Sequence, residues 1–225
     1  MQPVISAEEL SLTAARGRVY GPLSFTVKDP LTVLCGPAGS GRTSLLLTLS
    51  GRMKAGSGSL EVLGAALPRD ARQVQKQTGI AGFSGIDDLE PGVTAGAAVR
   101  ERLAWLAPWW QFVPKVSDRQ LARVCSPVFG SLDVPAAKTV IWDLGEAEQF
   151  LLRISLAMLS RPRILFVDDL EQVHSSQARA LVEERLAAIA LSGTAVVAGA
   201  ASVPTQPWSG SETEPATVLI AEESH

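Results

Sequence analysis

A glycine-rich stretch at residues 36–44 has the residue types and the spacing of a phosphate-binding loop. It follows a β-rich run and opens a helical pattern, which is the context that a Walker A loop requires. Glycines allow backbone angles that turn successive N–H groups inward, and the start of a helix adds unpaired donors and the positive end of its dipole. The pattern predicts nucleotide binding by Gly36, Pro37, Ala38, Gly39, Ser40, Gly41, Arg42, Thr43 and Ser44.

Two side chains of this loop indicate its chemistry. The hydroxyl of Thr43 is placed to ligate Mg²⁺. Arg42 stands where the pattern has lysine, and a planar guanidinium cannot occupy the same position as a compact ammonium group. Because arginine still neutralises phosphate, we expect nucleotide binding to survive better than hydrolysis. The alternative is a glycine- and serine-rich turn that only caps a helix.

A second candidate site follows the apolar run Ile164-Leu-Phe-Val, which ends at Asp168 and Asp169. A buried parallel strand delivers a carboxylate at its C-terminal end, where ligands bind in such sheets. We expect Asp168 to hold Mg²⁺ opposite Thr43. By itself the pattern also fits a strand that ends in a solvated turn, and it gains weight from the phosphate loop.

Short apolar strands alternate with helical patterns along the chain, which predicts an α/β domain with a partly parallel sheet. Strands are predicted at Leu23–Val27, Leu31–Cys35, Leu60–Leu63, Arg163–Val167, Thr194–Ala198 and Thr217–Ala221. Helices are predicted at Arg42–Arg52, Gln73–Gln77, Phe150–Leu159 and Ala178–Ala190, and the stretch Pro204–Pro215 is predicted as a loop. Residues 86–140 are the least regular, with a helical patch at Ala97–Ala104, and we interpret them as a helical subdomain inserted into the core.

Composition excludes several classes of protein. The 225 residues suit one domain, and a net charge of −3 argues against a nucleic-acid groove. Cys35 and Cys125 are expected to be buried, reduced thiols of a cytosolic protein. The first ten residues lack the features of a signal peptide, and no run reaches the roughly 18 apolar residues that a membrane helix needs. Any membrane association is therefore expected to go through a partner.

The chain resembles the ATPase subunits of ABC transporters over nearly its whole length. The resemblance rests on the loop at 36–44, on Ser57-Gly-Ser-Leu-Glu-Val-Leu-Gly64, on Glu90-Pro-Gly-Val-Thr94 and on the segment Ser160 to Asp169. It implies a P-loop NTPase-like core with a mixed or parallel sheet, an N-terminal antiparallel β region and a helical subdomain at about 86–150 in a single domain, 1–225.

The chain departs from this family at several positions. The signature Leu-Ser-Gly-Gly-Gln should begin at Leu144, 24 residues before Asp168, and the chain has Leu-Gly-Glu-Ala-Glu there. In the family this loop contacts the γ-phosphate on the opposite subunit, and Glu146 would bring negative charge toward it. The family's catalytic glutamate matches Asp169, which is shorter by one methylene. Its Q-loop glutamine, switch histidine and adenine-stacking aromatic fall near Gly85, Ala200 and Ala14.

The resemblance implies a subunit that binds ATP and Mg²⁺, pairs with a second ATP-binding subunit as a homo- or heterodimer, and acts on a membrane-spanning partner from the cytoplasmic face of the membrane. In the active form, Asp169 would polarise the attacking water. The alternative is a non-catalytic nucleotide-binding module with a regulatory or scaffolding role, because losses among groups that act together reduce catalysis strongly. A P-loop protein of another family, such as a kinase, is a third hypothesis. The sequence indicates neither the transported molecule nor the direction of transport.

Overall fold

The computed structural model describes residues 3–203, 208 and 215–220. Its strands are β1 (Ile5–Ala14), β2 (Gly17–Val27), β3 (Leu31–Cys35), β4 (Ser57–Val62), β5 (Ala65–Leu67), β6 (Thr78–Ala81), β7 (Ile164–Val167), β8 (Ala195–Ala200) and β9 (Ala216–Leu219). Its α-helices are α1 (Arg42–Leu49), α2 (Ala71–Gln77), α3 (Ala95–Leu106), α4 (Asp118–Phe129), α5 (Glu146–Met158) and α6 (Ser176–Leu191). Two short 3₁₀ helices, η1 (Ile141–Asp143) and η2 (Leu170–Gln172), complete the described elements.

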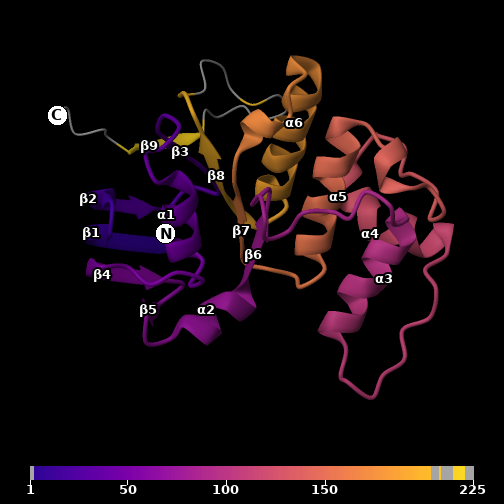
Figure 1. Cartoon of the computed structure of the whole chain (residues 1–225), viewed down its shortest axis with the longest axis horizontal. Coiled ribbons are helices and arrows are strands. Elements are labelled where there is room, and N and C mark those ends of the chain that lie inside the picture. Colours follow the sequence, from indigo (N-terminus) through magenta and orange to yellow (C-terminus); the bar gives the residue numbers. More distant parts are fainter. Residues whose placement is uncertain (1–2, 204–207, 209–214, 221–225) are drawn as a thin grey trace.

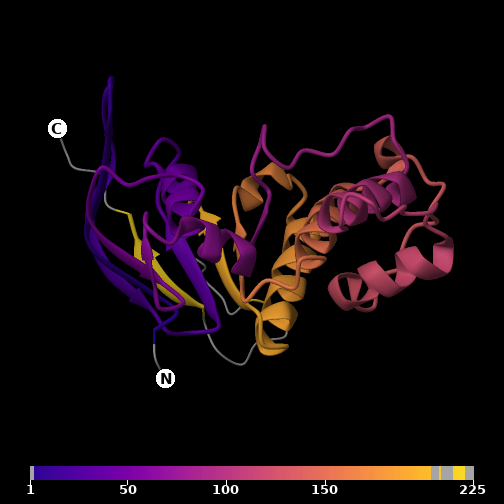
Figure 2. The same ribbon diagram turned by 90° about the horizontal axis from the view of Figure 1, so that it is seen from below.

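The strands form two sheets (Figure 1). Four N-terminal strands make an antiparallel sheet in the order β2-β1-β4-β5. The other five make an all-parallel sheet in the order β6-β7-β8-β3-β9. In Figure 2 the antiparallel sheet lies at one end of the molecule and helices α3, α4 and α5 at the other. The predicted α/β fold and its N-terminal antiparallel region are confirmed.

The central strands bury both faces, which explains why their sequences are continuous apolar runs. Leu34, Phe166 and Val197 pack into one core with α1 and the antiparallel sheet. Their chain neighbours Leu165 and Val196 pack into a second core with residues of α3 to α6. Because side chains alternate along a strand, one short apolar run supplies both cores and fixes the sheet between two layers.

Three of the six described α-helices lie between β6 and β7, where the sequence predicts an inserted helical region. The helical patch at Ala97–Ala104 lies within α3. Helix α4 and strand β6 were not predicted, although α4 begins with a capping box in which Ser117 and Gln120 exchange hydrogen bonds. None of the described helices is long and apolar enough to cross a lipid bilayer.

Several predicted boundaries are wrong for local reasons. Helix α1 ends at Leu49, before the predicted Arg52, because Gly51 adopts a left-handed φ of 74°. Strand β4 ends at Val62, because Leu63 also has a positive φ. Most of the predicted loop Pro204–Pro215, and Ala221 of the last predicted strand, lie outside the described residues.

Candidate nucleotide-binding site

The glycine-rich loop joins the C-terminal end of β3 to the start of α1, as the sequence predicts. Gly36 is anchored to the neighbouring strand, since its N–H donates to the carbonyl of Ala200 at 3.1 Å. Gly39 and Gly41 have φ of 88° and 81°, which L side chains rarely adopt. A Cβ at Gly41 would also collide with the carbonyl of Val19 in β2. The loop is therefore a compact turn whose backbone only glycine can form at residue 41.

Polar groups of this loop are buried without internal partners. The Oγ of Ser40 and the Nη1 of Arg42 have no hydrogen-bond partner. The first N–H groups of α1 have no carbonyl one turn earlier to bind, and the helix dipole makes this end attractive to anions. Unpaired buried donors are costly, so their concentration here suits a ligand that accepts hydrogen bonds. The residues predicted to bind nucleotide form this turn and the first residues of α1.

Asp168 lies directly after β7 and is 2% exposed. Its Oδ1 has no hydrogen-bond partner, and a Cβ added to Gly199 would lie 3.0 Å from it, so the glycine leaves room for the carboxylate. Burial raises the pKa of Asp168, and the neighbouring Thr43 hydroxyl opposes that shift. A buried carboxylate oxygen beside a hydroxyl is the donor set that a hard divalent cation prefers, so both predicted metal ligands fit Mg²⁺.

Asp169 occupies a strained position at the start of η2. Its φ is 49°, a left-handed conformation that is uncommon for a non-glycine residue. Burial raises the pKa of its carboxyl group, and the negative charge of Glu171 raises it further. The residue is partly exposed at the edge of the site, consistent with a carboxylate that reaches water there.

Glu171 belongs to the same site, although the sequence analysis did not identify it. Its Oε2 lies 3.6 Å from the Nη2 of Arg42, and its Oε1 accepts a hydrogen bond from the N–H of Ala201 at 2.5 Å. The sequence signal was an acidic residue three positions after Asp168. Nothing in the spacing indicated that the chain would turn back through η2 toward the phosphate loop.

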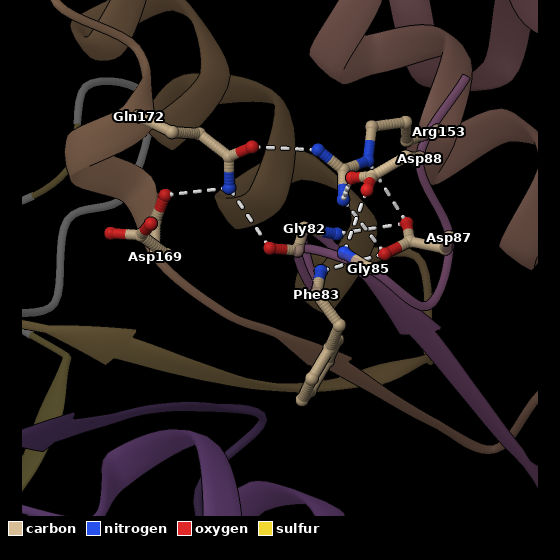
Figure 3. Close-up of polar contacts among 8 residues, drawn as sticks. All are labelled: Gly82, Phe83, Gly85, Asp87, Asp88, Arg153, Asp169 and Gln172. Atoms are coloured by element: carbon tan, nitrogen blue, oxygen red, sulfur yellow. Dashed lines mark hydrogen bonds and ion pairs between the residues drawn. The ribbon is translucent and has the colours of Figure 1, made fainter. Parts of the chain in front are cut away.

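Next to the site, Arg153 of α5 forms a partly buried ion pair with Asp87 in the loop after β6 (Figure 3). Its Nη2 and Nε donate to the two carboxylate oxygens of Asp87 at 2.8 and 3.0 Å. Asp87 also accepts from the N–H groups of Gly82 and Phe83 at 3.0 and 2.6 Å. One carboxylate thus fixes both the backbone of this loop and the guanidinium of α5.

Gln172 extends this network to the residues after β7. Its Oε1 accepts from the Nη1 of Arg153 at 2.6 Å, and its Nε2 donates to the carbonyls of Gly82 and Asp169, both at 2.9 Å (Figure 3). The network therefore joins α5, the loop after β6 and the backbone of Asp169. It was not predicted, because its members lie far apart in the sequence.

The segment at the signature position forms the start of α5, four residues before the predicted start at Phe150. The N–H of Gly145 donates to the carboxylate of Glu148 at 2.7 Å. The carboxylate of Glu146 accepts from the N–H of Ser175 at 3.1 Å and lies 3.2 Å from the Nδ1 of His174. The N–H of Ser175 and the ring of His174 lower the pKa of Glu146. Glu146 is thus held by its own chain, on the segment after η2.

The sequence also departs from the ABC pattern at Gly85 and Ala14, and the only tyrosine of the chain is Tyr20. Gly85 has a φ of 76° and donates its N–H to Asp88 at 2.6 Å. Ala14 is exposed at the end of β1. Tyr20 is 3% exposed, and its hydroxyl donates to Thr48 of α1 at 2.8 Å, so its ring belongs to the core.

Comparison with known proteins shows similarity to the ATP-binding proteins of transporters. A protein-family model described as "ABC transporter" matches residues 20–171. The chain is 25% identical to Nod factor export ATP-binding protein I of Cupriavidus pinatubonensis over 193 residues, which is 86% of this chain and 53% of that protein. It is 26% identical to the protein of the same name from Rhizobium meliloti, over 87% of this chain and 57% of that protein. The chain thus spans a little over half the length of these relatives.

Solved structures share the fold at lower sequence identity. The dimeric structure of MJ0796, described as a bacterial ABC transporter cassette, matches with a TM-score of 0.68 at 16% identity and covers 88% of each chain. A putative ABC transporter ATP-binding protein from Pyrococcus furiosus matches with a TM-score of 0.70 at 15% identity and covers 96% of each chain. At such identities these structures support the fold alone.

Proposed function

Because the chain belongs to the ABC transporter family, we propose that it is an ATP-binding subunit whose nucleotide-driven dimerisation acts on a separate membrane-spanning subunit. The observation that carries this proposal is the glycine-rich turn at residues 36–44, which holds unpaired polar groups opposite the unpaired carboxylate oxygen of Asp168. A triphosphate with Mg²⁺ supplies what these groups lack: oxygen acceptors for the donors and a cation for the carboxylate.

In this proposal the site residues divide between phosphate binding, Mg²⁺ binding and the positioning of water. The backbone of the loop and Arg42 bind the phosphates, while Thr43 and Asp168 hold Mg²⁺, which would neutralise the charge that develops on the phosphates. Asp169 orients a water molecule at the edge of the site. We propose that hydrolysis is slow, since the carboxylate of Asp169 is one methylene shorter than that of the glutamate it replaces.

A non-catalytic nucleotide-binding module is the second candidate. It is favoured by Glu146, an acidic residue at the signature position, where the family contacts a phosphate bound by a second subunit. It is also favoured by Ala200, which falls near the position where the family has its switch histidine. ATP binding without turnover would support this candidate.

The test measures ATP binding by calorimetry and phosphate release for the purified chain, both with and without Mg²⁺. The active form predicts slow turnover that Asp169→Asn abolishes while binding remains. Asp168→Asn should remove the Mg²⁺ dependence of binding, whereas Asp133→Asn, the same change at an exposed residue, should alter neither quantity. ATP affinity that is unaffected by both Arg42→Ala and Asp168→Asn would contradict the proposed site.

We propose that the membrane-spanning subunit docks at a cleft of about 490 Å³ between α3, α5 and the loop after β6. Trp105 lines this cleft and is 78% exposed. Exposed aromatic side chains continue beyond it at Trp109, Trp110 and Phe112. The three tryptophans therefore do not form a subdomain core, and large exposed aromatic groups commonly anchor interfaces.

Recovery of a membrane protein with the chain tests this surface. Trp105→Ala should reduce the amount of co-purified membrane subunit, whereas Trp142→Ala, an equally exposed tryptophan outside the cleft, should not. Equal recovery with both variants would contradict the assignment of the cleft. We also propose that the chain pairs with a second ATP-binding subunit, as a homo- or heterodimer; the MJ0796 cassette, which has the same fold, is described as dimeric. We further propose that residues 1–225 act as one domain, with the helical part at about 86–150, on the inner face of the membrane.

A further inference from the structure

Two charged side chains at the phosphate loop face each other without a direct hydrogen bond. The side chain of Arg42 is 11% exposed and that of Glu171 is 33% exposed. Their closest atoms are 3.6 Å apart, and both Arg42 Nη1 and Glu171 Oε2 are buried without a hydrogen-bond partner. The negative charge of Glu171 therefore lies beside a guanidinium that would otherwise be free to bind phosphate.

The carboxylate of Glu171 is held in place by the strand that borders the loop. Its Oε1 accepts from the N–H of Ala201, and the preceding carbonyl, that of Ala200, accepts from the N–H of Gly36. The fixed carboxylate and the glycine turn therefore share one anchor, the end of β8. Carboxylates and phosphates bind guanidinium groups through the same kind of oxygen pair, so Glu171 and a phosphate compete for Arg42.

We propose that Glu171 suppresses a preference of the loop for nucleoside triphosphates over diphosphates, by holding Arg42 as an internal counter-ion. The inference rests on the proposed function, namely that the loop binds a nucleotide. A terminal phosphate that arrives at the loop meets a guanidinium that is already neutralised, beside the carboxylates of Asp168 and Asp169. The additional charge of a nucleoside triphosphate then contributes little, and the protein binds nucleoside diphosphates and triphosphates with similar affinity.

The test compares dissociation constants of ADP and ATP at constant Mg²⁺ for the wild-type chain and Glu171→Gln. Glutamine keeps the length of the side chain and can still accept from Ala201, so the variant removes the negative charge and preserves that hydrogen bond. We expect the two wild-type constants to agree within about threefold. In the variant we expect ATP binding to tighten about tenfold, equivalent to about 1.4 kcal/mol, and ADP binding to tighten less than about threefold.

Two controls separate this effect from a general change of charge or stability. Glu184→Gln makes the same substitution at a 41% exposed position on α6 and should leave both constants unchanged. In an Arg42→Gln background, Glu171→Gln should no longer improve ATP binding, because no guanidinium remains to be released. Thermal unfolding of each nucleotide-free variant verifies that it is folded.

The inference is overturned if Glu171→Gln leaves ATP affinity unchanged, weakens it, or tightens ADP and ATP equally. It is also overturned if the effect persists in full without the Arg42 guanidinium, since Glu171 would then act on phosphate directly. Binding by the wild-type chain with no effect of Glu171 contradicts this inference alone. A wild-type chain and variants that bind neither nucleotide contradict the proposed function as well.

Discussion

Replacement of Arg153 by glutamine should destabilise the chain far more than the loss of an exposed arginine. The side chain of Arg153 is 9% exposed and joins Asp87 to Gln172 through three hydrogen bonds of 2.6 to 3.0 Å. A glutamine side chain is shorter than that of arginine. It cannot donate two parallel N–H groups to Asp87 and also donate to Gln172. The substitution leaves a partly buried carboxylate with fewer donors, and it separates α5 from the residues after β7.

The magnitude follows from burial and from what remains of the network. Removal of one partner of a buried ion pair costs about 3–5 kcal/mol. Asp87 is 20% exposed and keeps the N–H groups of Gly82 and Phe83, which reduces the penalty. We therefore expect a loss of about 2–3 kcal/mol, at or just below the lower limit of that range. For a chain of this size the melting temperature should fall by roughly 4–12 °C.

Urea unfolding of four proteins measures the effect: wild type, Arg153→Gln, Asp87→Asn and the double variant. The coupling energy between the two side chains should be about 1–3 kcal/mol, because they contact each other directly. Arg69→Ala is the control, since Arg69 is 80% exposed and pairs with the adjacent Asp70. A coupling energy near zero, or equal losses for Arg153→Gln and Arg69→Ala, would refute the assignment of Arg153 as the structural link.

Further predictions concern the glycine turn and the buried thiol of Cys125. Gly41→Ala should prevent nucleotide binding and lower stability by about 3 kcal/mol or more, because a Cβ there strikes the backbone of β2 at a positive φ. Gly39→Ala adds a Cβ into open space and should cost only about 1–2 kcal/mol of backbone strain. Urea unfolding measures the loss of stability in each variant, and equal losses for Gly41→Ala and Gly39→Ala would contradict this account. Burial raises the pKa of Cys125 to about 11, so at pH 8 only about one thiol in a thousand is ionised, and iodoacetamide should label it only after unfolding. Rapid labelling of Cys125 in the folded chain would show that α4 opens readily.

The features that the sequence predicted correctly are local in origin. The glycine turn could be predicted because a few adjacent residues need backbone conformations that glycine allows. The strand before Asp168 could be predicted because a strand that is buried on both faces is a continuous run of apolar residues. Strand β6 was missed because its four residues include a glycine and a threonine and give no clear apolar run. Helix α5 was predicted to begin at Phe150, because its first turn is polar and is stabilised by the contact between Gly145 and Glu148.

The long-range contacts of the site could not be predicted from spacing. Arg153 lies 66 residues from Asp87 and 19 from Gln172, and only the packing of α5 on the sheet brings the three side chains together. Glu171 likewise reaches Arg42 because η2 reverses the chain after β7. Sequence analysis identified which groups could bind phosphate and Mg²⁺. Only the structure showed which other charges compete with them.

A crystal structure of the chain with a non-hydrolysable ATP analogue and Mn²⁺ tests the central claim most directly. The account predicts phosphate density within the turn at residues 36–44, with an anomalous Mn²⁺ peak between the Thr43 hydroxyl and the Asp168 carboxylate. A turn without density at millimolar nucleotide, with Arg42 still paired to Glu171 and no metal beside Asp168, would contradict it.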